Sequence, residues 1–140
     1  MPVRNAEATW DGSLHDGSGT VALGSGAYEG AYSFGSRFED DPGTNPEELI
    51  GAAEAGCFAM ALALGLGDAG YDPERLHAEA SVHLDADALE ITHVDLSVEG
   101  VVPDIDAATF REHAEDAKDG CPVSKALAGP DIELTATLVE

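Results

Sequence analysis

Residues 45–68 read NPEELIGAAEAGCFAMALALGLGD, and this stretch decides the fold. Asn45 is a residue type that caps helix N-termini, and Pro46 suits the first helical position. Glu47 and Glu48 follow at once, where the positive end of the helix dipole favours carboxylates. The sequence therefore predicts a helix that begins at Asn45 and continues to the end of the stretch.

The second half of this helix, residues 56–64, is apolar on every side, so we expect it to be buried all round. Its many Ala and Gly residues leave little side-chain bulk, which lets another helix approach closely. We interpret it as the central helix of the fold, packed against its own copy in a dimer. The most apolar part, residues 55–66, is about half the length that a bilayer span needs, so no membrane-spanning segment is expected.

The flanking sequence carries short alternating stretches and one further helix pattern. No linker, repeat or low-complexity tract divides the chain, so we expect a single domain over residues 1–140. The predicted class is α+β, with antiparallel sheet and the helices grouped on one side. The predicted strands are residues 8–10, 19–23, 32–38, 76–84, 89–102 and 132–139, with a helix at 107–119 and a helical turn at 121–127.

The charge of the chain is strongly unbalanced. Among 140 residues, 28 are acidic and 6 are basic, which gives a net charge of −22. Such a surface repels phosphate backbones and anionic lipids, so nucleic acid and membranes are excluded as expected partners. Because hydrophobic residues make up 44% of the chain, we predict a folded protein from a high-salt cytoplasm rather than disorder. The N-terminus has no apolar region of a secretory signal, so we expect a soluble, cytoplasmic protein.

Two cysteines, Cys57 and Cys121, lie 64 positions apart, and neither belongs to a paired zinc motif. They are either inert core residues or a redox pair. Burial would raise the pKa of Cys57, so a reactive thiolate needs a cation from elsewhere in the structure. Arg37 is the natural supplier, because it lies in an apolar, strand-like segment where an arginine must be paired or functional.

An arginine in such a place needs a carboxylate to hold it. Glu47 lies ten positions before Cys57, which returns it to nearly the same face of the helix, whereas Glu48 is about 100° away from that face. Glu47 is therefore the better candidate for the partner of Arg37. The alternative, that both glutamates only complement the helix dipole, stays open on spacing alone.

Two cysteine motifs and the helix start resemble the OsmC branch of the OsmC/Ohr family, the osmotically inducible protein C and organic hydroperoxide resistance proteins. The similarity lies in RFE at 37–39, GTNPEELIGAAEAGCF at 43–58 and AKDGCPVSKAL at 117–127, with ATWDG at 8–12 and VPDID at 102–106 in support. It covers nearly the whole chain in the expected order. One difference is Gly56, where the family motif more often has alanine.

The resemblance implies an OsmC-like fold and an intertwined homodimer with two active sites at the subunit interface. It also implies a thiol peroxidase for organic hydroperoxides that uses no cofactor. Cys57 matches the peroxidatic cysteine, Cys121 the resolving one, Arg37 the thiolate-stabilising arginine and Glu47 the glutamate that orients it. The implied reductant is an external dithiol, such as a lipoylated protein.

Other functions remain open from the sequence. The same disulfide would serve a redox-sensing or binding protein with little turnover, and inert thiols would fit a purely structural dimer. Four apolar residues near the motifs are candidates for an alkyl-binding groove or for plain core: Phe34, Phe58, Met60 and Val123. The five histidines form no His-x-x-x-His pair, so we expect surface or hydrogen-bonded histidines and no metal site.

Overall fold

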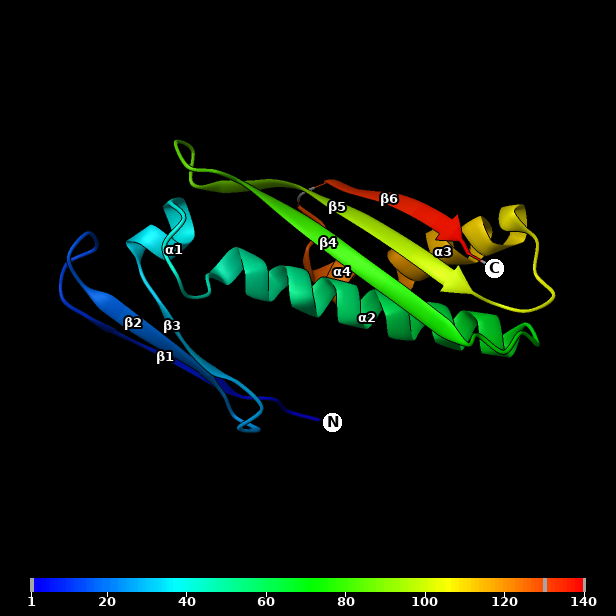
Figure 1. The fold of residues 1–140 in the computed structure, drawn as a ribbon, viewed down its shortest axis with the longest axis horizontal. Coiled ribbons are helices and arrows are strands. Elements are labelled where there is room, and N and C mark those ends of the chain that lie inside the picture. The colour runs from blue at the N-terminus through cyan, green and yellow to red at the C-terminus, as the bar shows by residue number, and fades with distance from the viewer. Residues whose placement is uncertain (1, 130, 140) are drawn as a thin grey trace. The chain divides into compact units, whose positions relative to one another are not determined.

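The computed structural model describes residues 2–129 and 131–139. The chain divides into two compact units, Met1–Leu49 and Ile50–Glu140. The first unit is a three-stranded antiparallel sheet of β1 (Ala6–Asp11), β2 (Ser18–Leu23) and β3 (Glu29–Tyr32), followed by the short helix α1 (Phe34–Phe38) (Figure 1). The predicted hairpin of the first two strands is confirmed.

The segment that carries Arg37 is a helix, so the predicted strand at residues 32–38 is wrong. Ser33 and Ser36 form a capping box: each side chain accepts a hydrogen bond from the backbone N–H of the other residue, at 3.0 and 2.8 Å. This reciprocal cap satisfies two N–H groups that a helix start leaves free, and it outweighs the β-like pattern of the aromatic residues. Arg37 consequently projects from the last turn of α1.

The long helix α2 (Pro46–Asp68) begins where the sequence predicts. The side-chain oxygen of Asn45 accepts a hydrogen bond of 2.7 Å from the backbone N–H of Glu48, and its amide nitrogen donates to the Ser36 carbonyl at 3.1 Å. With 23 residues, α2 is by length and composition long and apolar enough to cross a membrane, so the shorter run of residues 55–66 underestimated its apolar length. The sequence estimate of length counted only an uninterrupted apolar run, whereas the helix continues past one internal carboxylate, Glu54. Core helices of soluble proteins pass the same test.

The two sides of α2 differ, which corrects the expectation of burial all round. Phe58, Leu62 and Leu66 are completely buried in the core of the second unit. Met60 and Leu64, on the other side, are 77% and 66% exposed. In the single chain, α2 is therefore buried on one face and apolar but exposed on the other.

The second unit is built on the sheet order β4-β5-β6 (Figure 1). Strands β4 (Arg75–Asp85) and β5 (Glu90–Val101) form the predicted hairpin. Strand β6 (Asp131–Leu138) pairs parallel with β5, which corrects the expected all-antiparallel pairing. The reason lies in the connection, because the helices α3 (Ala107–Gly120) and α4 (Pro122–Ala126) return the chain to the end at which β5 began.

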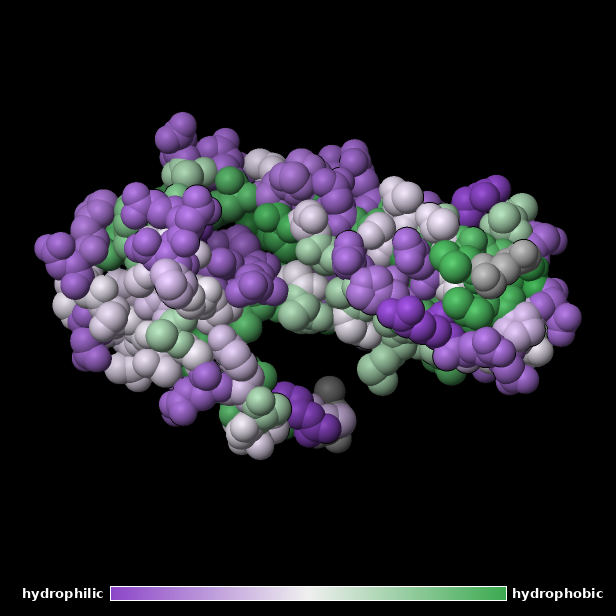
Figure 2. Space-filling model, viewed as in Figure 1, coloured by the Kyte–Doolittle hydropathy of each residue, from purple (hydrophilic) through white to green (hydrophobic). Residues whose placement is uncertain are grey.

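One face of this sheet packs against α2 and α3. The core joins the aliphatic face of β5 to Phe58, Leu62 and Leu66 of α2 and to Phe110 and Ala114 of α3. The opposite face of the sheet is polar. Hydrophilic residues are spread over the molecular face in Figure 2, interspersed with apolar areas.

Candidate active site

The two cysteines meet in the second unit. Cys57 lies in the middle of α2, and Cys121 occupies the junction where α3 ends and α4 begins. Both are free thiols, and their Sγ atoms are 2.6 Å apart. Because the sulfur atoms of a disulfide are about 2.05 Å apart, a small movement is enough to bond them. Cys121 is completely buried, whereas Cys57 is partly exposed and is the thiol that a substrate can reach.

A buried hydrogen bond fastens the two cysteine-bearing segments together. The Ser124 hydroxyl donates to Oε1 of Glu54 at 2.6 Å. Glu54 lies three residues before Cys57 on α2, and Ser124 lies three residues after Cys121. Both are buried, and Oε2 of Glu54 has no hydrogen-bond partner among the described residues. The sequence analysis missed this pair, although a lone carboxylate inside an apolar helix is a signal that could have found it.

The surroundings of Cys57 favour its neutral form. Burial raises the pKa of Cys57, and the hydrogen bond that the Cys57 thiol shares with Cys121 raises it further, against a lowering contribution from the Val123 backbone N–H. The nearby charge of Glu54 acts in the raising direction as well. The direction agrees with the sequence argument that a reactive Cys57 needs a cation.

Arg37 and Glu47 form a bidentate ion pair in the first unit, as predicted. Nε of Arg37 donates to Oε1 of Glu47 at 2.9 Å, and Nη2 donates to Oε2 at 2.8 Å. This fork fixes the plane of the guanidinium, and the hydrogen bond with Glu47 raises the pKa of Arg37, so its charge is permanent. Glu48 instead accepts from the Thr44 hydroxyl at 2.8 Å. The choice of Glu47 over Glu48 is therefore confirmed.

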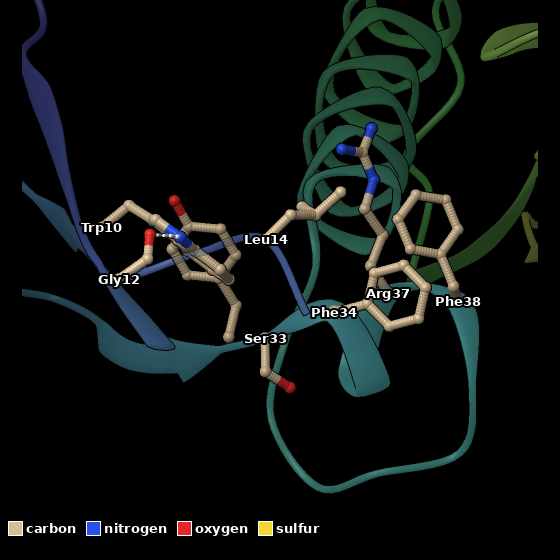
Figure 3. A pocket seen from close by; sticks show the side chains of 8 residues that line it. Trp10, Gly12, Leu14, Ser33, Phe34, Arg37 and Phe38 are labelled. Carbon is tan, nitrogen blue, oxygen red and sulfur yellow. Dashed lines mark hydrogen bonds between the residues drawn. The ribbon is translucent and has the colours of Figure 1, made fainter. Parts of the chain in front are cut away.

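The guanidinium group stands beside an apolar pocket of about 390 Å³ (Figure 3). The rings of Phe34 and Phe38 lie close to the Arg37 side chain, and the guanidinium carbon is 5.3 Å from the centre of the Phe38 ring. Trp10 and Tyr32 pack with their ring centres 5.3 Å apart on another side of the pocket. The pocket thus combines aromatic walls with one fixed positive charge.

The predicted groove residues have different environments. Phe34 lines the pocket beside Arg37. Phe58 belongs to the core of the second unit, so it is a core residue and not part of a groove. The cysteine pair belongs to the second unit and the Arg37–Glu47 pair to the first, and the predicted action of Arg37 on Cys57 stays a prediction.

Comparison with known proteins identifies the family. A family model described as OsmC-like protein matches residues 38–135, a range that contains three of the four predicted site residues, Glu47, Cys57 and Cys121, and begins one residue after Arg37. The chain belongs to the OsmC family. Two relatives, both named Peroxiredoxin OsmC, come from Escherichia coli strain K12 and Shigella flexneri. Each is 49% identical over 127 residues, which is 89% of this chain and 89% of the relative.

Solved structures of OsmC and Ohr proteins share the fold. The OsmC-like protein from Mycoplasma pneumoniae has a TM-score of 0.77 at 16% identity and covers 99% of both chains. The organic hydroperoxide resistance protein OhrB of Bacillus subtilis has a TM-score of 0.67 at 24% identity and covers 96% of this chain and 98% of its own. At these identities the likeness concerns the fold alone, and it confirms the OsmC-like architecture of two small sheets and a long helix.

Proposed function

We propose that this OsmC-family chain reduces organic hydroperoxides to alcohols, with Cys57 as the attacking thiolate and Cys121 as the resolving thiol. It is a peroxidase of the peroxiredoxin type, as its relatives named Peroxiredoxin OsmC indicate. The single observation that supports the two-cysteine mechanism best is the 2.6 Å separation of the two free sulfur atoms. We also propose that residues 1–140 act as one OsmC-like domain.

The reaction has three balanced steps. The Cys57 thiolate attacks the peroxide O–O bond, one oxygen stays on sulfur as a sulfenic acid, and the other leaves as the alcohol after taking up a proton. The Cys121 thiol then displaces the sulfenic hydroxyl, which forms the Cys57–Cys121 disulfide and releases water. An external dithiol reduces the disulfide by two exchange steps and is itself oxidised. A lipoylated protein is the class of dithiol that the family resemblance implies, and no cofactor takes part.

Arg37 supplies the positive charge that the thiolate requires, and Glu47 holds the guanidinium in place. The raised pKa of Cys57 in the single chain supports this role, because a thiolate would not persist at neutral pH without a cation. The bidentate geometry favours recognition of an anion or a peroxide oxygen on the remaining guanidinium edge. The alkyl part of the substrate would occupy the aromatic pocket beside Arg37.

We propose that the working enzyme is a homodimer in which α2 packs against the α2 of a second copy. The exposed residues of α2 that support this form one stripe at a spacing of four: Ala52, Gly56, Met60 and Leu64. Small residues at this spacing let two helices approach closely, and burial of the two large side chains would stabilise the dimer. In that assembly each active site would take groups from both subunits.

The surroundings of the enzyme follow from its surface. It is a soluble protein, and we place it in the cytoplasm, where thiols stay reduced. Neither nucleic acid nor a membrane is among the partners we propose, because 28 acidic residues against 6 basic ones repel both.

Steady-state turnover tests the proposal against a redox sensor. Wild-type protein in high salt, with dihydrolipoamide as reductant, should consume cumene hydroperoxide catalytically, and Cys57→Ser should abolish consumption. A sensor would form the disulfide once and then turn over poorly. Complete oxidation of the protein without sustained peroxide consumption would therefore favour the sensor.

A further inference from the structure

Two histidines and an aspartate meet on the outer, polar face of the second sheet. His83 of β4 and His93 of β5 lie directly opposite each other in the antiparallel register, and Asp95 follows two residues later on the same face of β5. The two imidazole rings stack with their centres 3.8 Å apart and an angle of 11° between them. One ligand atom from each of the three residues lies within 4.8 Å of the others.

Both imidazoles turn the same nitrogen towards the carboxylate. Nε2 of His83 is 2.7 Å from Oδ2 of Asp95, and Nε2 of His93 is 3.6 Å from that same oxygen. The atoms thus converge on one point above the sheet. The side chains are 45%, 37% and 47% exposed, so an ion can reach this point directly from solvent.

A β-bulge beside the cluster places a polar residue next to His93. The β4–β5 register shifts between His83 and Leu84, which leaves Thr92 as an extra residue on β5. The Thr92 hydroxyl lies 3.4 Å from Nδ1 of His93 and 3.5 Å from the carbonyl oxygen of His83. A polar partner on Nδ1 orients the ring so that Nε2 is the ligand, as in many metal-binding histidines.

Carboxylates surround the cluster. Glu133 of β6 lies opposite Asp95 in the parallel register, and Asp131 lies opposite His93. The local field therefore attracts cations.

We propose that His83, His93 and Asp95 bind a divalent transition metal ion of the Zn²⁺ type, outside the peroxidase site. Two imidazoles and a carboxylate suit Zn²⁺, Co²⁺ or Ni²⁺ better than Mg²⁺ or Ca²⁺, which prefer oxygen ligands alone. Ligand atoms in a tetrahedral Zn²⁺ site stand about 3.3 Å apart, and the observed 2.7 and 3.6 Å lie on either side of this value. The stacked rings must turn out of their parallel arrangement so that both Nε2 lone pairs point at the ion, and a fourth position stays open to water.

The test is binding of Zn²⁺ to the full chain in competition with a chromophoric chelator. To keep the active-site thiols from binding the ion, the titration uses protein with Cys57→Ser alongside the wild type. We expect one tight Zn²⁺ equivalent per chain and a loss of affinity of about tenfold or more in His83→Gln and in His93→Gln. His77→Gln is the matched control, because His77 lies on the same face of β4 and contacts its own carboxylate, Glu79, at 3.2 Å.

Two outcomes would overturn the proposal: absence of tight binding, or equal affinity in all variants, which would mean diffuse attraction to the acidic surface. Co²⁺ provides a second readout that does not depend on activity or on the thiols. A tetrahedral nitrogen–oxygen site gives visible ligand-field bands without thiolate charge transfer, and these bands should vanish in His93→Gln and persist in His77→Gln. Circular dichroism of each variant checks that the sheet is intact.

Discussion

At the scale of single residues, the buried carboxylate of Glu54 is the most unusual group in the candidate site. It is completely buried, one of its oxygens has no partner among the described residues, and the other is held only by Ser124. Such a group costs free energy, so its presence beside the two thiols suggests a positioning role. By joining α2 to α4 it keeps Cys57 and Cys121 at bonding range.

Removal of the Ser124 hydroxyl tests this role. In Ser124→Ala, Oε1 of Glu54 also loses its partner, and the free energy of unfolding should fall by about 1–3 kcal/mol. Closure of the disulfide after peroxide addition should also slow, as followed by loss of free thiol in stopped flow. Ser18→Ala, an exposed strand residue, is the control. If Ser124→Ala lowers the free energy of unfolding but leaves the rate of disulfide closure unchanged, the Ser124–Glu54 hydrogen bond is a purely structural contact.

The titration of Cys57 carries a second prediction at this scale. Because the hydrogen bond shared with Cys121 favours the protonated thiol and raises the pKa of Cys57, Cys121→Ala should lower that pKa. Arg37→Ala should raise it, if the guanidinium stabilises the thiolate as proposed. The pH dependence of bimane labelling measures both shifts, with Arg111→Ala as an exposed arginine control. Labelling curves that coincide for Arg37→Ala and wild type would refute the role of Arg37.

Among the elements, α1 shows how a short cap positions a functional side chain. The Ser33–Ser36 capping box sets the helix, and the helix aims Arg37 at Glu47. Ser33→Ala should lower the free energy of unfolding by about 0.5–2 kcal/mol and reduce peroxidase activity, because the guanidinium loses its fixed orientation. Ser81→Ala, exposed on β4, should change neither quantity in chemical denaturation and activity assays. Full activity in Ser33→Ala would show that α1 does not need its cap to hold Arg37.

The exposed face of α2 carries the prediction of the dimer. A charge at Leu64 would have to be desolvated between the two helices, so Leu64→Glu should shift the protein from dimer to monomer. Sedimentation or size-exclusion chromatography with light scattering measures the change. Val3→Glu places the same charge at a residue that is 73% exposed and lies outside α2, and it should stay dimeric. A dimer that survives Leu64→Glu would require another interface.

At the scale of the whole molecule, the large negative net charge makes the stability of the fold depend on salt. A net charge of −22 repels itself, and the screening length falls from about 30 Å at 0.01 M salt to about 3 Å at 1 M. We therefore expect the melting temperature to rise by several degrees between these concentrations, as measured by circular dichroism. A melting temperature that does not change with salt would contradict the predicted adaptation to high salt.

The sequence predicted the features that local chemistry controls. The Asn45–Pro46 helix start, the β4–β5 hairpin and the choice of Glu47 as the partner of Arg37 all follow from capping, turn residues and helical spacing. It did not predict the parallel pairing of β6, because that depends on where two intervening helices leave the chain. The sequence also did not predict that His83 and His93 lie together. Their pairing depends on the register between two strands and not on spacing along the chain.

The most direct test of the central claim is to map the oxidised cysteines after one equivalent of cumene hydroperoxide. In the wild type, mass spectrometry of the digested protein should find the Cys57–Cys121 disulfide. In Cys121→Ser, the reaction should stop at the sulfenic acid, and dimedone should label Cys57. Labelling of Cys121 in Cys57→Ser at a similar rate, or no oxidation of either thiol in the wild type, would contradict the account.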